Sequence, residues 1–164
     1  MLQNELVASL KRLELIRKIR IRRSLNSLGL HPGQPQMIQY IIDHPECTQK
    51  EVADELSVTP ASVAASLKRL QKSGIIIRKS DPLDSRRNRL SITEKGRMLN
   101  CEAVNAFSKM DQIMFDGISE DDRIAFKRMC DRIFDNLADE KTRDLNVCRL
   151  HSAYMKMESQ KEEE

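Results

Sequence analysis

Two short capped helices, predicted between Thr48 and Gly74, constrain the fold of this chain more than any other feature. Thr48 and Glu51 have the spacing of a capping box, in which each side chain binds the other residue's free backbone N–H. Thr59 is a good N-cap, and Pro60 follows it at the first helical position, where a missing N–H costs nothing. Gly74 ends the second helix. Two helices joined by so tight a turn form a helix-turn-helix, whose second helix enters the major groove of DNA.

A charged hairpin is predicted directly after these helices. The β-branched run 75–77 and the alternating segment 90–93 suit two short strands. The segment between them begins with turn-forming residues and continues into Arg86, Arg87 and Arg89. An arginine-rich turn by itself is usually a solvated surface loop. Its place after a helix-turn-helix instead favours the wing of a winged helix, with guanidinium groups against phosphates or in the minor groove.

These segments resemble the winged-helix core of the multiple-antibiotic-resistance-regulator (MarR) family of bacterial transcription factors. The matching segments are His31-Pro32-Gly33-Gln34-Pro35 with 37–41, 48–53, Asp81-Pro82-x-Asp84-x-Arg86-Arg87, and 90–96. The resemblance extends over residues 1–137 and is most specific in the wing and at 93–96. It implies an obligate homodimer that binds a pseudo-palindromic operator and usually represses transcription. It also implies that a small ligand or an oxidation often releases the DNA.

The charge distribution is compatible with a nucleic-acid partner. The net charge of the 164 residues is only +3, which is weak evidence alone. Residues 1–100, however, hold 18 Lys and Arg against 10 Asp and Glu, whereas residues 101–164 hold 10 against 15. The positive field therefore lies on the half that contains the helix-turn-helix and the wing, where phosphate contacts would be made.

The rest of the chain is predicted to be helical, which gives a mainly α fold with a small β-hairpin wing (α+β). We expect an N-terminal dimerisation helix over 1–30, the winged helix-turn-helix over 31–96, and C-terminal dimerisation helices over 97–137. The long helices carry apolar faces too large for a small winged domain to cover, so we expect them to pack against a second copy. Residues 138–164 form a charged tail, in which the spacing of Val147, Leu150 and Tyr154 allows a partly ordered extra helix.

The candidate DNA-binding residues fall into three groups. The start of the first short helix, Gln49 and Lys50, would position a phosphate. The second helix would read bases, and the wing would hold the backbone and minor groove, with Asp84 orienting Arg86. The residues expected on these two elements are Thr59, Ala61, Ser62, Ala65, Ser66, Lys68 and Arg69 on the helix, and Lys79, Asp84, Arg86, Arg87 and Arg89 on the wing. In the resembled family a larger polar or basic residue is common at the position of Ala65, so we expect methyl contacts and DNA shape to contribute to specificity here.

The sequence gives little information on an effector or on catalysis. Arg17, Met37 and Tyr40 are weak candidates for an effector cleft, and core packing is the more common role for Met37. No glycine-rich phosphate loop, Gly-x-Ser-x-Gly motif or clustered histidines are present, so we expect no enzyme, cofactor or metal. Two alternative functions remain at this stage: a repressor that senses oxidation through a thiol, and a winged-helix adaptor that binds protein. The first is disfavoured because the first helix has no cysteine, where the peroxide-sensing members of the family carry theirs.

The expected compartment is a reducing cytoplasm. The cysteines Cys47, Cys101, Cys130 and Cys148 are widely spaced and form no Cys-x-x-Cys pair, which is typical of free thiols. No stretch approaches the ~18 uncharged apolar residues that a membrane span requires, and no secretory signal is recognised. We therefore expect no membrane partner.

Overall fold

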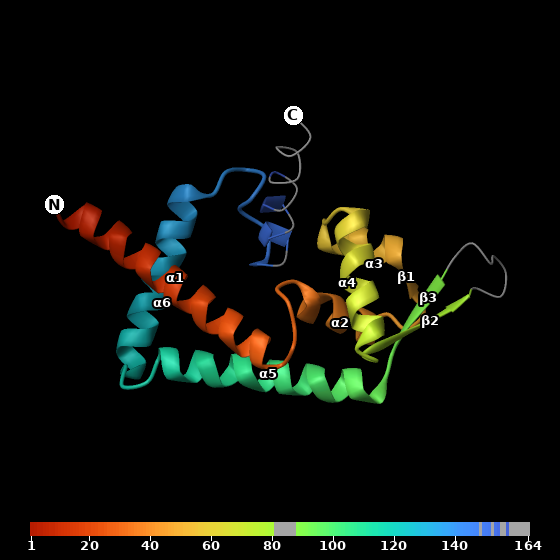
Figure 1. Ribbon diagram of the computed structural model, residues 1–164. Helices are drawn as coiled ribbons and strands as arrows, with labels where there is room; N and C mark the ends of the chain where they lie inside the picture. Colours follow the sequence, from red (N-terminus) through yellow and green to blue (C-terminus); the bar gives the residue numbers. More distant parts are fainter. Residues whose placement is uncertain (81–87, 148, 152, 155–156, 158–164) are drawn as a thin grey trace.

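The computed structural model describes residues 1–80, 88–147, 149–151, 153–154 and 157, and its fold is mostly helical with one small antiparallel sheet (Figure 1). The expected fold class is therefore confirmed. The elements are α1 Leu2–Ser27, α2 Gln34–Asp43, β1 Cys47–Thr48, α3 Gln49–Leu56, α4 Pro60–Lys72, β2 Ile76–Ser80, β3 Asn88–Ile92, α5 Glu94–Met114 and α6 Glu120–Leu137.

The sheet contains one strand more than the sequence predicts. Its order is β1-β3-β2, and both pairs are antiparallel. The two-residue β1 pairs Cys47 with Leu90, so the segment before the helix-turn-helix joins the wing sheet. Such a short strand has no periodicity of its own to reveal it.

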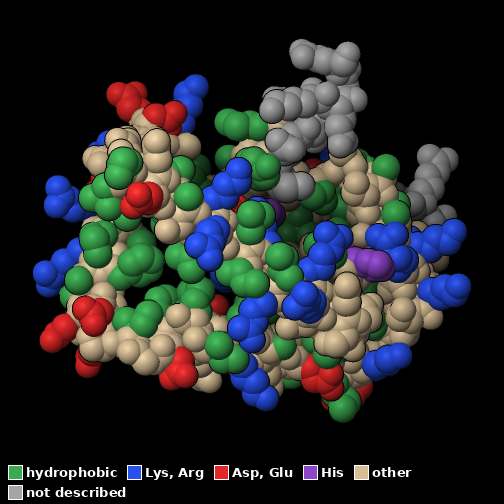
Figure 2. All heavy atoms as spheres, turned by 60° about the vertical axis from the view of Figure 1, so that its left-hand side comes forward, with side chains coloured by type: hydrophobic (Ala, Val, Ile, Leu, Met, Phe, Trp, Pro, Cys, Tyr) green, Lys and Arg blue, Asp and Glu red, His purple; other side chains and the backbone are tan. Residues whose placement is uncertain are grey.

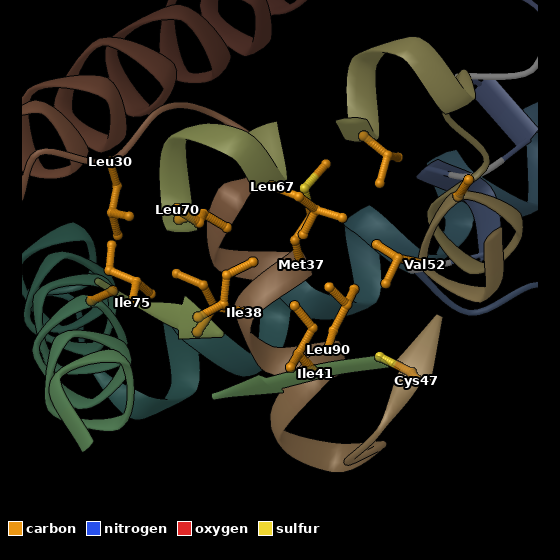
Figure 3. Close-up of a cluster of buried hydrophobic side chains, with 14 of the residues drawn as sticks. Leu30, Met37, Ile38, Ile41, Cys47, Val52, Leu67, Leu70, Ile75 and Leu90 are labelled. Atoms are coloured by element: carbon orange, nitrogen blue, oxygen red, sulfur yellow. The ribbon is translucent and has the colours of Figure 1, made fainter. Parts of the chain in front are cut away.

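One apolar core holds α2, α3, α4 and the sheet together. Figure 3 shows its side chains converging from these elements, with Met37, Ile38 and Ile41 of α2 at the centre. Ile38, Ile41 and Leu67 are fully buried. Leu25 of α1 and Ala103 of α5 also belong to this core, which fixes the position of α4.

The long helices form a frame beside this unit. Helix α5 runs from the wing along one side of the molecule, α1 ends against α5, and α6 turns back from the far end of α5 (Figure 1). Gly29 and Gly117, at the ends of α1 and α5, both have φ near +70°, as glycine allows. Among the described residues, no helix combines the length and apolar character needed to cross a bilayer.

Two segments add detail to the expected fold. Helix α2 begins at Gln34, because Gly33 takes a left-handed conformation (φ 85°) and acts as the N-cap before Pro35. The described residues of the tail between Val147 and Tyr154 are helical, as their spacing allows.

Candidate nucleic-acid interface

The helix-turn-helix is built by the capping residues that the sequence predicts. The Glu51 carboxylate accepts a hydrogen bond from the Thr48 N–H at 2.6 Å, and the Glu51 N–H donates to Thr48 Oγ1 at 3.3 Å, which completes the capping box. Ser57 ends α3 in a left-handed conformation (φ 52°), and Thr59 Oγ1 accepts from the Ser62 N–H at 3.2 Å to begin α4. The turn between the helices is therefore only three residues long.

The two helices are also tied together directly. Gln49 Nε2 donates to the Pro60 carbonyl at 3.3 Å, which joins the start of α3 to the start of α4. Lys50, the next residue of α3, is exposed. The half-buried Gln49 side chain thus helps to orient α4, whereas the Lys50 side chain is exposed to solvent.

Most of the predicted reading face of α4 is exposed. The exposed members are Thr59, Ala61, Ser62, Ala65, Lys68 and Arg69. Two of their hydroxyls are linked, because Thr59 Oγ1 donates to Ser62 Oγ at 2.9 Å. The opposite face of the helix packs into the core through Val63, Leu67 and Leu70.

Ser66 is a correction, because it does not lie on the exposed face. It is only 9% exposed, and its Oγ accepts a hydrogen bond from Arg69 Nη2 at 3.2 Å. The spacing of Val63, Ser66, Leu67 and Leu70 is the i, i+3, i+4, i+7 pattern of a buried stripe. Ser66 therefore belongs to the inner face despite its polar side chain, and it holds the Arg69 guanidinium against the helix.

The described part of the wing presents cations at its base. Lys79 on β2 is exposed and pairs in register with Arg89 on β3. The Arg89 Nη1 donates to the Glu46 carbonyl at 3.2 Å, so this guanidinium also anchors the segment before β1. Asp84, Arg86 and Arg87, expected at the tip of the wing, lie outside the described residues.

A cleft separates the helix-turn-helix from the base of the wing. Its volume is ≈ 890 Å³, and we call it the α3–wing cleft. It is lined by residues 48–51, Ala53, Asp54, Pro60, Arg78 and 88–90. The sequence interpretation missed Arg78, whose Nε and Nη2 are buried and have no hydrogen-bond partner in the part of the chain that the structure describes.

The joint between the winged helix and α5 is tightly fastened. Thr93 Oγ1 donates to the Gly74 and Ile75 carbonyls at 2.7 and 3.0 Å and accepts from the Gly96 N–H at 3.0 Å. At Gly96 an added Cβ would lie 2.3 Å from the Ile75 carbonyl oxygen and 2.5 Å from Ile92 Cδ1. The start of α5 is therefore fixed against the end of α4 and the start of β2.

The three weak effector candidates do not come together at one cavity. Met37 is buried in the core, and Tyr40 is half-buried and stacks on His44 with ring centroids 4.2 Å apart. Arg17 lines an apolar cavity of ≈ 340 Å³ between α1, α5 and α6, which neither Met37 nor Tyr40 lines, and its Nη2 lies 3.7 Å from Asp111.

The described cysteines differ in environment. Cys47 is buried, and burial, with a smaller contribution from the Glu51 charge, raises the pKa of its thiol to about 11. Cys101 and Cys130 are exposed and free. Among the described residues, no group of three or more His, Cys, Asp or Glu side chains is arranged to hold a metal ion.

Comparison with known proteins finds similarity to one family over the winged helix. A model of the MarR family matches residues 28–87, which contain α2, the helix-turn-helix and the start of the wing. Over these residues the chain is similar to the MarR family. Because members of this family are transcriptional regulators and not enzymes, the match supports the expectation that the chain is not an enzyme.

Individual relatives agree with this similarity. The HTH-type transcriptional regulator BilQ of Clostridioides difficile (strain CD3) is 30% identical over 94 residues, 57% of this chain and 64% of BilQ. The chain thus spans less than two thirds of the length of the curated relatives that it matches. The crystal structure of MarR is 28% identical with a TM-score of 0.61, covering 80% of this chain and 90% of MarR. The repressor CouR, bound to a 23-mer DNA duplex, is 25% identical with a TM-score of 0.62, covering 76% of this chain and 89% of CouR.

Proposed function

We propose that this chain is a DNA-binding transcriptional regulator of the MarR family, a homodimeric repressor that a small-molecule effector releases from its operator. The observation that carries the proposal is the exposed outer face of α4, held by caps and core packing beside a cationic wing base. This arrangement lets α4 enter a major groove while the wing contacts the adjacent backbone and minor groove. The DNA complex of the relative CouR supports the same use of the fold.

Within this proposal, the predicted site residues have different roles. Thr59, Ala61, Ser62 and Ala65 present methyl groups and hydroxyls, which contact thymine methyls and accept or donate at base edges. The cations Lys50, Lys68, Lys79 and Arg89 and the wing arginines Arg86 and Arg87 contact phosphates or the minor groove, with Asp84 orienting Arg86. Arg69 adds to the positive field of α4 while Ser66 holds it.

The homodimer is supported by the exposed apolar faces of the long helices. None of the 18 residues of α6, all of which the structure describes, is buried. Leu13 on α1, Ile113 on α5 and Phe126 on α6 are 54%, 54% and 41% exposed. In the space-filling view of this side, hydrophobic side chains lie open at the surface among Lys and Arg side chains (Figure 2). A second copy of the chain would bury these faces and hold two α4 helices one turn of DNA apart.

Release by an effector is supported by the cavity between α1, α5 and α6. The ≈ 340 Å³ cavity is lined mainly by apolar side chains such as Leu10, Leu13 and Phe126. Its charged lining residues are Arg17, Arg123 and Glu14, two cations and one anion, and the mostly apolar lining suits a small aromatic or aliphatic molecule. A ligand there would act on the geometry of α1 and α5, and α5 is fixed to the winged helix through Thr93 and Gly96.

The test is binding of the purified chain to duplex DNA from the region that flanks its own gene, measured by fluorescence anisotropy at low and moderate salt. We expect binding that weakens steeply with salt, because phosphate contacts release counterions. Ala65→Glu, which places a carboxylate on the exposed face of α4, should abolish binding without unfolding the protein. Gln3→Glu, which adds the same charge at the far end of α1, should bind as the wild type does.

The same assay separates the alternatives. A protein-binding adaptor would ignore duplex DNA even in dilute buffer. A thiol sensor would lose DNA binding on treatment with peroxide, in a way that Cys101→Ser or Cys130→Ser prevents. The raised pKa of buried Cys47 disfavours that residue as the sensor, because the thiolate is the reactive form.

A further inference from the structure

The buried guanidinium of Arg78 is the unexplained polar group of the winged helix. Its Nε and Nη2 have no hydrogen-bond partner within the described residues, although both atoms are shielded from solvent. Buried donors without partners cost free energy, and a cationic group costs more than a neutral one. One explanation for such a group in a folded protein is a ligand that binds there and accepts its hydrogen bonds.

The position of Arg78 on β2 explains how it becomes buried. Side chains two residues apart on a strand point to the same face, so Arg78 shares the face of Ile76, which is 1% exposed. Its register partner is Leu90, which is also 1% exposed. The opposite face of the strand holds Ile77 and Lys79, which are exposed. Arg78 thus occupies a core-side position of the sheet, at the point where the core gives way to the α3–wing cleft.

The cleft itself has the character of an anion site. Arg78, Arg89 and Lys50 line it from β2, β3 and α3. The acidic residues that line it are Glu51 and Asp54; the Glu51 carboxylate accepts from the Thr48 N–H and Oγ1. The cleft also includes the first residues of α3, where the helix dipole favours negative charge.

We propose that Arg78 binds a backbone phosphate of the DNA, which enters the α3–wing cleft when α4 is seated in the major groove. The proposal rests on the proposed function, since it names a contact within the same interface. The phosphate would accept the two N–H donors that lack partners in the free chain, and a guanidinium fork matches two phosphate oxygens in one plane. The contact is to the backbone, so it adds affinity and register without reading sequence.

A phosphate contact and a purely structural role of Arg78 predict different effects of substitution on stability and on DNA affinity. Arg78→Met keeps an unbranched side chain, shorter than that of arginine, and removes the unpartnered donors. We expect the free protein to keep or raise its Tm, because a buried unsatisfied cation is lost. At the same time DNA affinity should fall about tenfold or more, equally on any duplex sequence. The dependence of log K on log[salt] should become shallower by about one for each copy of Arg78 that engages the duplex.

Two variants make the measurement specific. Arg78→Lys keeps the charge and loses the fork, so we expect intermediate affinity with a salt dependence near that of the wild type. Lys127→Ala removes a cation whose side chain is 76% exposed on α6 and does not line the cleft, so it should bind DNA as the wild type does. All four proteins are compared by fluorescence anisotropy with duplex DNA and by thermal unfolding without it.

The outcomes are distinguishable from those of the proposed function. Wild-type protein that binds no duplex would overturn both proposals. Wild-type protein that binds, with unchanged affinity and salt dependence in Arg78→Met, would overturn this one alone. A lower Tm in Arg78→Met with an unchanged salt dependence would make Arg78 a structural residue and would also overturn it. Inorganic phosphate that raises the Tm of the wild type but not of Arg78→Met, with DNA affinity unchanged, would assign the cleft to a free anion instead.

Discussion

The winged helix buries its apolar side chains within one chain, whereas the long helices α1, α5 and α6 leave many of theirs at the surface. Ile38, Val52 and Leu67 of the winged helix are fully buried. Leu13 on α1 and Ile133 on α6 are 54% and 44% exposed. Helix α6 has an apolar stripe as regular as those of the winged helix, yet none of its residues is buried.

The difference shows that an apolar stripe predicts a buried face but not the partner that buries it. In the winged helix the caps, the tight turn and the hairpin bring α2, α3, α4 and the sheet around one core. In the frame each helix has few neighbours within the chain, and its exposed stripe is a large apolar surface of the kind that obligate dimers share. Stability of the first region should therefore depend on the single chain, and that of the second on concentration.

Replacing a core side chain gives the largest effect and tests this contrast. Leu67→Ala removes a fully buried leucine of α4, and we expect it to destabilise folding by about 2–5 kcal/mol. Leu13→Ala, on the exposed stripe of α1, should change the stability of the single chain by about 0.5 kcal/mol or less at low concentration. Urea unfolding at several protein concentrations measures both. Equal losses at every concentration would remove the distinction between the regions.

Adding one methyl group where α5 meets the winged helix should give the next largest loss of stability. Gly96→Ala places a Cβ against the Ile75 carbonyl oxygen at 2.3 Å, a contact that backbone atoms cannot easily relieve. We expect a cost of about 1–3 kcal/mol from overpacking. Asn105→Ala, at an exposed position of the same helix, is the control. Thermal unfolding that is unchanged by Gly96→Ala would show that α5 is not fixed to the winged helix as described.

Loss of the cap of α4 is a smaller and more local change. Thr59→Ala removes the Oγ1 that accepts from the Ser62 N–H, and we expect a loss of about 1 kcal/mol. Thr59→Ser keeps the hydroxyl and should restore most of that loss. If both variants unfold at the same denaturant concentration, the cap does not contribute to the stability of the winged helix.

Ionisation of the Cys47 thiol should not change folding stability near neutral pH, but it should lower folding stability measurably in alkali. Its pKa is raised in the folded chain to about 11 from an ordinary value of 9.0, so the folded state holds the proton more tightly than the unfolded state. This contribution is fully present below pH 9 and is lost as pH rises towards 11. Stability measured from pH 8 to 11 should fall less in Cys47→Ala than in the wild type. An Ellman's assay of the native protein should label Cys101 and Cys130 well before Cys47.

Much of the winged helix could be predicted because its signals are local. The capping residues Thr48, Thr59 and Thr93 fix where three helices begin, and the β-branched run after Gly74 fixes a strand. The polarity of Ser66 favours an exposed position, whereas its spacing from Val63 and Leu67 places it on the buried face. Strand β1 has no signal in the sequence, because it exists only through its pairing with β3.

The site residue that the sequence did not reveal is Arg78, and the reason is its register. Its position two residues after Ile76 places it on the buried face, but only the strand pairing with Leu90 shows that this face meets a cleft. The sequence also indicates the apolar faces of α1 and α6, but a single chain does not identify the surface that covers them. A short-range sequence pattern does not reveal contacts that depend on strand pairing or on a second molecule.

The most direct test of the account is the stoichiometry of the complex with duplex DNA from the region flanking the gene, measured by sedimentation velocity. The account predicts a dimer at micromolar concentration without DNA and two chains on each duplex with it. Ile133→Glu, on the exposed stripe of α6, should give a folded monomer that binds the duplex weakly. A wild-type chain that stays monomeric at these concentrations, or that does not sediment with duplex DNA in dilute buffer, would contradict it.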